Sequence, residues 1–191
     1  MEQQVFLIRH GETEWSRAGR HTGRTDIPLT AAGRFRAQAI GRALRGRKLS
    51  VWTSPLERAR DTCRLAGFAD AAKVDDDLCE WDYGNYEGLT TQEIGRAAPG
   101  WSVWLSPIIG GESIEQVADR ARRVVGRALA AGDGDVGLFG HGHILRIVAA
   151  CWIGLPPLTG RFLALDTASI SVLGYEHQTR VVRQWNLQPP A

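Results

Sequence analysis

The sequence predicts an α/β fold with three layers, in which a mostly parallel central sheet lies between two layers of helices. Short apolar runs that suit buried strands occur at residues 5–8, 51–53 and 136–139. Longer stretches with apolar residues at helical spacing lie between and after these runs. Strands that alternate with helices are typical of a domain with a parallel sheet. The 191 residues suit one domain, so we expect a single domain over residues 1–191.

The expected helices begin where suitable capping or first-turn residues precede amphipathic stretches. Thr30 suits the N-cap of a helix over about residues 31–47. Ser54-Pro55 opens a helix toward Ala66, because proline suits the first turn. Further helices are expected over about residues 90–98, 112–131 and 144–153.

Three later segments complete the predicted sheet. Residues 74–78 are expected to form a short strand, and residues 169–175 and 180–185 form two late strands that can pair as a hairpin. Residues 89–111, by contrast, contain two tryptophans, two prolines and a Gly110-Gly111 pair. We expect this segment to be a short lid-like excursion over one end of the sheet, within the same domain.

Composition excludes several classes of protein. With 23 basic and 21 acidic residues, the net charge of +2 gives no electrostatic footprint for nucleic acid. The longest apolar stretch, residues 147–154, is far too short to span a bilayer. Three cysteines, far apart and odd in number, suit reduced thiols better than disulfides. The first residues lack a basic region followed by an apolar run, so we expect no signal peptide and a cytoplasmic location.

Polar residues follow three of the predicted strands where each strand ends. Arg9 and His10 follow the first strand, Arg58 lies one helical turn past the second, and His141 and His143 follow the third. Ligands of parallel sheets bind outside the carboxyl ends of the strands. We therefore expect the two arginines and two of these histidines to meet at one edge of the sheet.

These residue types suit phosphoryl transfer. Two arginines can bind a phosphate through their planar donors, and a neutral imidazole is a competent nucleophile toward phosphorus. A second imidazole can donate to the phosphoryl oxygens as charge builds there. A carboxyl group, which residues 78–84 can supply, is kept protonated by the nearby phosphate charge and can give its proton to the leaving oxygen. Because arginine and histidine supply positive charge, we expect no metal and no cofactor. Gly11 and Gly142 are expected to let the backbone approach the anion closely.

The motif Arg9-His10-Gly11 resembles the RHG motif of the histidine phosphatase superfamily, which includes the cofactor-dependent phosphoglycerate mutases. Further segments resemble later landmarks of this family in the same order, namely residues 20–23, 29–33, 54–62, 80–88, 111–113 and 140–142. The resemblance runs from about residue 5 to residue 177 and implies a phosphoglycerate mutase-like fold. It implies that His10 is phosphorylated, that Arg9, Arg58 and His141 complete the phosphate pocket, and that Glu80 is the proton donor.

The resemblance also implies substrate contacts. Residues 80–88, 141–146 and 174–177 look closest to sedoheptulose bisphosphatases of fungal type and to actinobacterial acid phosphatases. In the bisphosphatase type, the counterparts of three residues of this chain face the sugar or its distal phosphate. With the loop after the first strand, the predicted substrate-binding residues are Ser16, His21, Thr22, Gly23, Tyr83, Gly142, Arg146 and His177.

Two departures from the mutases favour hydrolysis. The segment between Glu80 and His141 is much shorter than in the mutases, and its part at 89–111 has one cation, Arg96. Ser16 stands where the mutases usually have asparagine. We therefore expect a metal-independent phosphatase of phosphorylated small molecules, with sugar phosphates or bisphosphates as the leading substrates.

Several alternatives stay open. The chain could be a mutase, a phosphatase of proteins or a non-catalytic module that binds phosphorylated ligands. Glu87 is the rival of Glu80 as the acid, and His143 is expected to be a helix-start histidine bonded to backbone. A homodimer is also left open.

Overall fold

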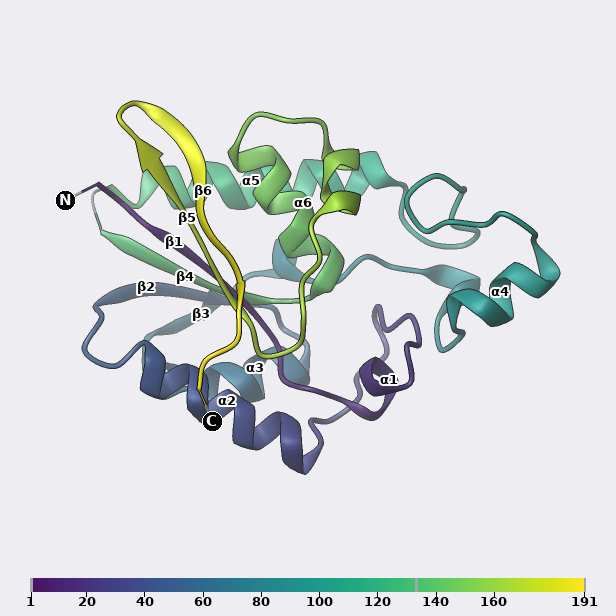
Figure 1. Cartoon of the computed structure of the whole chain (residues 1–191), viewed down its shortest axis with the longest axis horizontal. Helices are drawn as coiled ribbons and strands as arrows, with labels where there is room; N and C mark the ends of the chain where they lie inside the picture. Colours follow the sequence, from purple (N-terminus) through teal and green to yellow (C-terminus); the bar gives the residue numbers. More distant parts are fainter. Residues whose placement is uncertain (1, 133, 191) are drawn as a thin grey trace.

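One mixed sheet runs through the middle of the molecule (Figure 1). The computed structural model describes residues 2–132 and 134–190, and in these ranges six strands pair in the order β3-β2-β4-β1-β5-β6. The strands are β1 (Val5–Arg9), β2 (Leu49–Thr53), β3 (Ala72–Val74), β4 (Asp135–Gly140), β5 (Ile170–Glu176) and β6 (Thr179–Leu187). The pairs β1–β4, β2–β4 and β2–β3 are parallel, whereas β5 is antiparallel to both β1 and β6.

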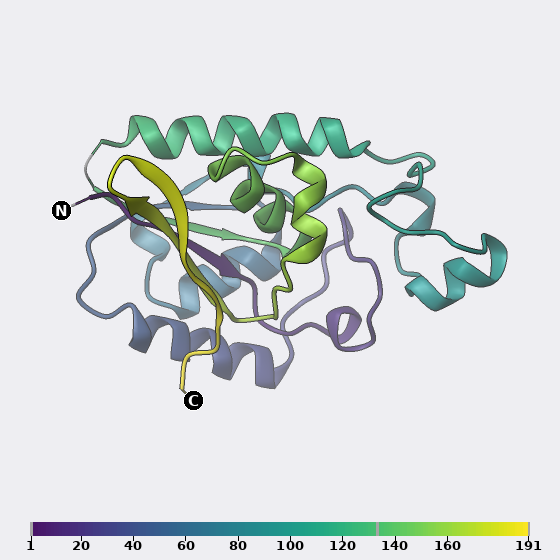
Figure 2. The same cartoon turned by 45° about the horizontal axis from the view of Figure 1, so that its top comes forward.

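Helices cover both faces of this sheet, which confirms the predicted three-layer arrangement. The helices are α1 (Glu14–Arg17), α2 (Ala31–Ala43), α3 (Glu57–Leu65), α4 (Thr91–Ala97), α5 (Ile114–Ala130) and α6 (Gly142–Trp152). Helices α2 and α3 lie on one face, and α5 and α6 lie on the other (Figures 1 and 2). Short 3₁₀ turns occur at Ala69–Ala71, Asp76–Leu78, Gly84–Tyr86 and Pro157–Phe162.

Strand β1 is apolar without interruption because both of its faces are covered. Val5 and Leu7 belong to the core under α5 and α6, and Phe6 and Ile8 belong to the core under α2 and α3. Successive side chains of a strand point to opposite faces, so a strand between two helical layers has no solvent side. Its polar residues can therefore begin only at the strand end, where Arg9 and His10 lie.

The predicted hairpin of β5 and β6 is confirmed, whereas the short strand predicted at residues 74–78 is wrong. The strand lies earlier, at Ala72–Val74, and Asp76–Leu78 is a 3₁₀ turn. The Asp75 carboxylate accepts a hydrogen bond from the Asp77 backbone N–H, which stabilises a turn in place of extended backbone. The helix predicted to begin at Ser54-Pro55 begins at Glu57, and the helix after Thr30 ends at Ala43.

The segment 89–111 contains α4 and extends beyond the carboxyl ends of β1 and β4 (Figure 2). Ile94, Trp101 and Val103 anchor it, because each is buried in the core next to α5. Its start pairs with the loop after α1, where the His21 backbone N–H donates to the Leu89 carbonyl. No helix within the described ranges is long and apolar enough to cross a membrane.

Two glycines bring the end of β1 against the start of α2. A Cβ atom on Gly11 would lie 2.5 Å from the Gly33 carbonyl oxygen, and a Cβ atom on Gly33 would lie 2.2 Å from the Glu12 carbonyl oxygen. Gly11 therefore has a packing role against the α2 backbone, and the expectation that it lets the backbone approach an anion stays a prediction. This contact fixes where the chain turns after His10.

We expect Gly33→Ala to destabilise the protein although alanine favours helices. The added methyl group must displace backbone, and overpacking of this kind costs about 1–3 kcal/mol. Urea unfolding measures the change in the free energy of unfolding. The control is Gly126→Ala in α5, where a Cβ atom meets nothing within 4 Å, so helix propensity should leave stability unchanged or raised by up to about 1 kcal/mol. Equal effects of the two substitutions would contradict the packing argument.

Candidate active site

The structure brings the predicted polar residues to one pocket at the carboxyl ends of β1 and β4. Arg9, His10 and Glu80 line this pocket, which has a volume of about 190 Å³. Behind His10 lies His141, with the centres of the two rings 5.2 Å apart. Arg58 reaches the same place from α3, and its Nε donates to His141 Nδ1 at 3.1 Å.

His10 is held in the form that a nucleophile needs. Its Nδ1 lies 2.7 Å from the Gly11 carbonyl oxygen. A carbonyl oxygen only accepts hydrogen bonds, so we assign the ring proton to Nδ1 and a lone pair to Nε2. Burial, followed by the charges of Arg58 and Arg9, lowers the pKa of His10 well below its usual value. The imidazole is therefore neutral near pH 7.

Arg9 has an unused hydrogen-bond donor at the pocket. One terminal nitrogen of its guanidinium donates to the Leu165 carbonyl. The buried Nε of Arg9 has no partner among the residues that the structure describes. A buried donor without a partner is costly, so this nitrogen suits an oxygen of a bound anion.

Arg58 is fully buried, and its donors bind protein groups. Nη2 donates to the carbonyls of Thr22 and Gly23, and Nη1 donates to the carbonyl of Thr25. Its Nε donates to His141, as described above. Arg58 therefore fixes the loop after α1 against the end of β4 and places its charge beside His10.

The same contact sets the tautomer of His141. Nδ1 accepts from Arg58, so Nε2 carries the proton, and it lies 2.8 Å from the Ser54 hydroxyl oxygen. Burial, then Arg58 and His10, lowers the pKa of His141 well below its usual value. His141 is therefore a neutral N–H donor next to His10. Ser54 is a site residue that the sequence did not single out, although it belongs to one of the recognised landmarks.

Glu80 lies where the chain enters the pocket beside α6. One carboxylate oxygen accepts from the backbone N–H groups of Trp81 and Ile144, and the other accepts from that of His143, each at 3.0 Å. Two of these donors belong to the first turn of α6, where unpaired N–H groups favour negative charge. Glu87, the rival acid, accepts from the Thr25 backbone N–H and does not line the pocket.

Most of the predicted substrate residues lie around this pocket. Those that line it are Ser16, His21, Thr22, Tyr83, Gly142 and Arg146. Gly23 lies behind the wall, since its carbonyl binds Arg58 and a Cβ atom there would lie 2.6 Å from the Trp81 carbonyl oxygen. The Ser16 hydroxyl also caps α1 through the backbone of Thr13.

The structure does not bring His177 to the pocket. Because β5 runs antiparallel to β1, the end of β5 lies beside the beginning of β1, at the opposite end of the sheet. His177 lies in the turn that joins β5 to β6, and Figure 1 shows this turn near the N-terminus. The expectation that His177 faces the substrate is therefore corrected by the direction of one strand.

His143 takes a larger part in the site than the sequence predicted. Its backbone N–H binds Glu80, as expected for a histidine at a helix start, but its ring also lines the pocket. The Tyr83 hydroxyl lies 2.6 Å from His143 Nδ1. Burial, followed by nearby cations led by Arg146, lowers the pKa of His143, and burial, then Glu80, raises the pKa of Tyr83. Both groups are therefore neutral near pH 7.

Arg146 lines the pocket but is held by several protein groups. Its Nε donates to the Gly160 carbonyl at 2.9 Å, and Nη2 donates to the Arg161 carbonyl at 3.1 Å. The guanidinium carbon lies 4.6 Å from the centre of the Trp104 ring. Arg146 thus lies at the pocket with two of its nitrogens bound to backbone carbonyls and its guanidinium over the Trp104 ring.

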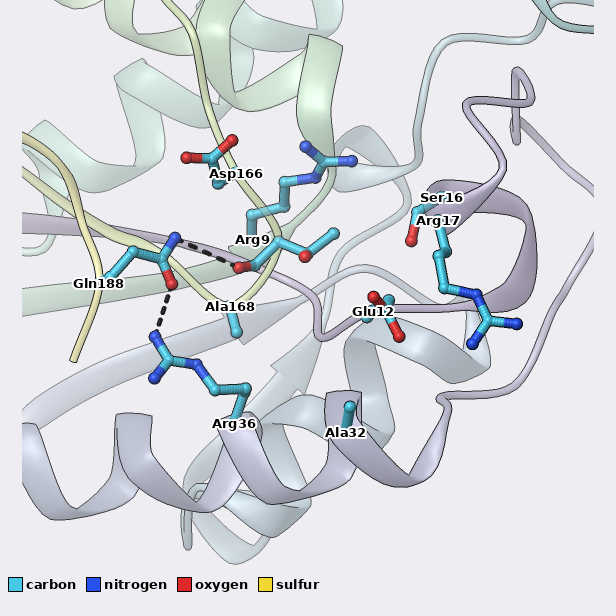
Figure 3. A pocket seen from close by; sticks show the side chains of 10 residues that line it. Arg9, Glu12, Ser16, Arg17, Ala32, Arg36, Asp166, Ala168 and Gln188 are labelled. Atoms are coloured by element: carbon cyan, nitrogen blue, oxygen red, sulfur yellow. Dashed lines mark hydrogen bonds between the residues drawn. The ribbon is translucent and has the colours of Figure 1, made fainter. Parts of the chain in front are cut away.

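A second hollow of about 450 Å³ lies on the other side of Arg9. It shares Arg9 and Ser16 with the smaller pocket and extends past Asp166 to Gln188, which follows β6 and whose side chain accepts from Arg36 (Figure 3). Neither His10 nor Glu80 lines this hollow. The side chains proposed as nucleophile and acid, His10 and Glu80, therefore meet in the smaller pocket. Within the described ranges, no three His, Cys, Asp or Glu side chains are grouped to hold a metal ion.

Residues 5–188 match the family model of the histidine phosphatase superfamily (branch 1), and the chain belongs to this superfamily. An acid phosphatase of Mycobacterium tuberculosis strain H37Rv is 44% identical over 181 residues, which cover 93% of this chain and 89% of that protein. The sedoheptulose 1,7-bisphosphatase of Saccharomyces cerevisiae is 35% identical, with coverage of 80% and 68%. The solved structure of an open reading frame product from Mycobacterium tuberculosis superposes with a TM-score of 0.94 at 42% identity and covers 100% of both chains. These similarities confirm the family, the fold and the assignment as a phosphatase.

We expect the unfolding free energy to fall when the pH drops below about 6.5. The pKa values of His10, His21, His141 and His143 are lowered, chiefly by burial, so the unfolded state binds more protons than the folded state below that pH. Each such histidine contributes a slope of up to about 1.4 kcal/mol per pH unit. Urea unfolding between pH 5.5 and 8 measures this slope, and His10→Gln should reduce it. A stability that stays constant over this range would contradict the neutral burial of these rings.

Proposed function

We propose that this phosphatase hydrolyses phosphomonoesters of small metabolites through a phosphohistidine at His10 and without a metal ion. The observation that carries the proposal is the hydrogen bond from His10 Nδ1 to the Gly11 carbonyl, which leaves Nε2 as the nucleophilic atom. Arg9 and Arg58 supply the positive charge that a phosphate requires. Sugar phosphates and bisphosphates are the leading substrates.

In the first step, His10 Nε2 attacks phosphorus while the bond from phosphorus to the ester oxygen breaks. The new bond is N–P, and the electron pair of the broken bond goes to the leaving oxygen. Glu80, protonated when the anionic substrate binds, gives its proton to that oxygen and releases an alcohol. Arg9 stabilises the charge on the phosphoryl oxygens through its unused Nε, and the positive charge of the buried Arg58 and the N–H of His141 act on it from behind His10.

In the second step, water attacks the phosphohistidine. The Glu80 carboxylate takes a proton from the water as the N–P bond breaks, so the acid of the first step becomes the base of the second. Inorganic phosphate leaves, and His10 returns to its neutral form with Glu80 protonated again. The sum of the two steps is hydrolysis of a phosphomonoester, with no proton left over.

The lining of the pocket supports a small polar leaving group. Hydroxyl and imidazole groups from Thr22, Tyr83, His21 and His143 surround a volume of about 190 Å³, which suits the hydroxyl groups of a sugar better than a folded phosphoprotein. The names of the two curated relatives, an acid phosphatase and a sedoheptulose 1,7-bisphosphatase, agree with this choice.

The alternatives have less support. The mutases carry basic residues for the phosphoglycerate in the longer segment before the second histidine, whereas Arg96, the one cation of residues 89–111, lies in α4 and does not line the pocket. A binding module would not need both a nucleophile and an acid.

We also propose a cytoplasmic location, which the three free thiols support, and no nucleic acid partner, since positive and negative charges nearly balance. A homodimer stays a prediction.

Loss of the nucleophile should abolish both turnover and phosphorylation of the protein. Wild-type protein quenched during turnover of a ³²P-labelled sugar phosphate, with a chelator present throughout, should carry acid-labile label. His10→Ala should carry none, and its circular dichroism spectrum should match that of the wild type. Label that persists in His10→Ala would assign the nucleophile to another residue, and activity that requires added Mg²⁺ or Zn²⁺ would contradict the metal-independent mechanism.

The fall in rate when the acid is removed should depend on the leaving group of the substrate. General acid catalysis contributes about 10²–10⁴-fold when the leaving group is poor. Glu80→Gln should therefore reduce kcat/KM at least about 100-fold on a sugar phosphate and less than about tenfold on p-nitrophenyl phosphate, whose phenolate leaves without a proton. Glu87→Gln is the control and should change neither rate more than about threefold. A larger loss for Glu87→Gln on the sugar substrate would move the role to Glu87.

A further inference from the structure

A buried ion pair lies behind Glu80, outside the pocket. Arg120 of α5 donates from Nε and Nη2 to the two carboxylate oxygens of Glu112, each at 2.8 Å. The Arg120 side chain is 10% exposed and that of Glu112 is 16% exposed. Neither residue lines the pocket, so neither touches a substrate bound there.

This pair binds the backbone on both sides of Glu80. Arg120 Nη1 donates to the carbonyls of Asp77 and Cys79 at 2.8 and 2.9 Å, and Nη2 lies 3.4 Å from the carbonyl of Glu80 itself. On the other side, the Glu112 carboxylate accepts from the Asp82 backbone N–H at 3.0 Å. The Glu112 backbone N–H donates to the Asp82 carbonyl at 3.0 Å.

Stability alone is a weak reason for such an arrangement. Burial of an ion pair costs desolvation that the attraction often does not recover, so an apolar pair would serve a core as well. The neighbouring ion pair of Arg123 with Asp77 differs, since the Arg123 side chain is 56% exposed and such contacts contribute little. What Arg120 and Glu112 add is a set of hydrogen bonds to the backbone between Cys79 and Asp82, the stretch that carries Glu80.

We propose that Arg120 and Glu112 are positioning residues for the general acid, because they hold the backbone from which the Glu80 carboxyl reaches the leaving oxygen. The inference rests on the proposed role of Glu80 as proton donor. Proton transfer requires the two heavy atoms to lie within about 2.6–3.2 Å, and a displacement of about 1 Å can cost 100-fold in rate. The phosphate-binding groups are attached to other elements, namely β1, α3 and the end of β4, so a change at Arg120 should leave phosphate binding intact.

Arg120→Lys tests the proposal, since lysine keeps the charge but not the planar pair of donors. We expect it to lower kcat on a sugar phosphate at least about tenfold, to change the rate on p-nitrophenyl phosphate less than about threefold, and to bind vanadate with unchanged affinity. Arg123→Lys, on the same helix and also paired with a carboxylate, that of Asp77, is the matched control and should show no dependence on the leaving group. Glu112→Gln should reproduce the selective loss, and it decides the question if Arg120→Lys does not fold.

The double variant Glu80→Gln, Arg120→Lys separates this inference from the proposed function. If Arg120 acts through Glu80, adding Arg120→Lys to Glu80→Gln should reduce the rate on the sugar phosphate less than about threefold further. Equal losses on both leaving groups, or a full additional loss in the Glu80→Gln background, would overturn the positioning role. If Glu80→Gln alone lowers the rates on the sugar phosphate and on p-nitrophenyl phosphate equally, the assignment of Glu80 as the acid is wrong. That outcome differs from a failure of the positioning role of Arg120.

Discussion

Arg58 is a fully buried cation, and the arrangement of the site follows from how its charge is accommodated. An isolated charge in a protein interior is very costly, so its donors must find acceptors. The carbonyls of Thr22, Gly23 and Thr25 and the ring of His141 provide them. Three segments far apart in the chain are thereby joined at one point, and the loop that lines one wall of the pocket is fixed to the layer of helices beneath it.

Burial, followed by the same charge, sets the protonation states that the proposed chemistry requires. Close to Arg58 and Arg9, and removed from water, the two imidazoles of His10 and His141 are held neutral. Each ring then has one N–H and one lone pair, and the partner of one nitrogen decides the role of the other. The Gly11 carbonyl leaves the lone pair of His10 at Nε2, as the proposed nucleophile needs, and Arg58 leaves the N–H of His141 at Nε2. A phosphate thus meets cationic arginines without competing with the nucleophile for a proton.

The proposed acid, Glu80, is positioned by hydrogen bonds from the backbone and not by a neighbouring charge. Glu80 accepts three backbone N–H groups, two of them from the start of α6. Its own backbone is in turn bound by Arg120, and that of Asp82 is bound by Glu112. In the proposed mechanism, phosphate binding and proton donation therefore share the start of α6, whereas the contacts of Arg120 and Glu112 belong to the acid alone.

Glu80 was assigned by the resemblance to the family, with Glu87 as its rival. The sequence alone determined the fold class, the pairing of β5 with β6, and the group formed by Arg9, His10, Arg58 and His141. Apolar runs and helical spacing specify the layers, and parallel strands must bring their carboxyl ends together, so these conclusions need only local pattern and one rule of sheet geometry. Only the tertiary structure decided what depends on direction or on contacts between distant segments. The antiparallel course of β5 moves His177 to the far end of the sheet, and the approach of α2 gives Gly11 a packing role. The contact of Tyr83 with His143 joins residues far apart in the chain, and so does that of Arg120 with the backbone before Glu80. Arg120 and Glu112 are eight residues apart, but one lies in a helix and the other in the loop before it. No periodicity in the sequence predicts such contacts.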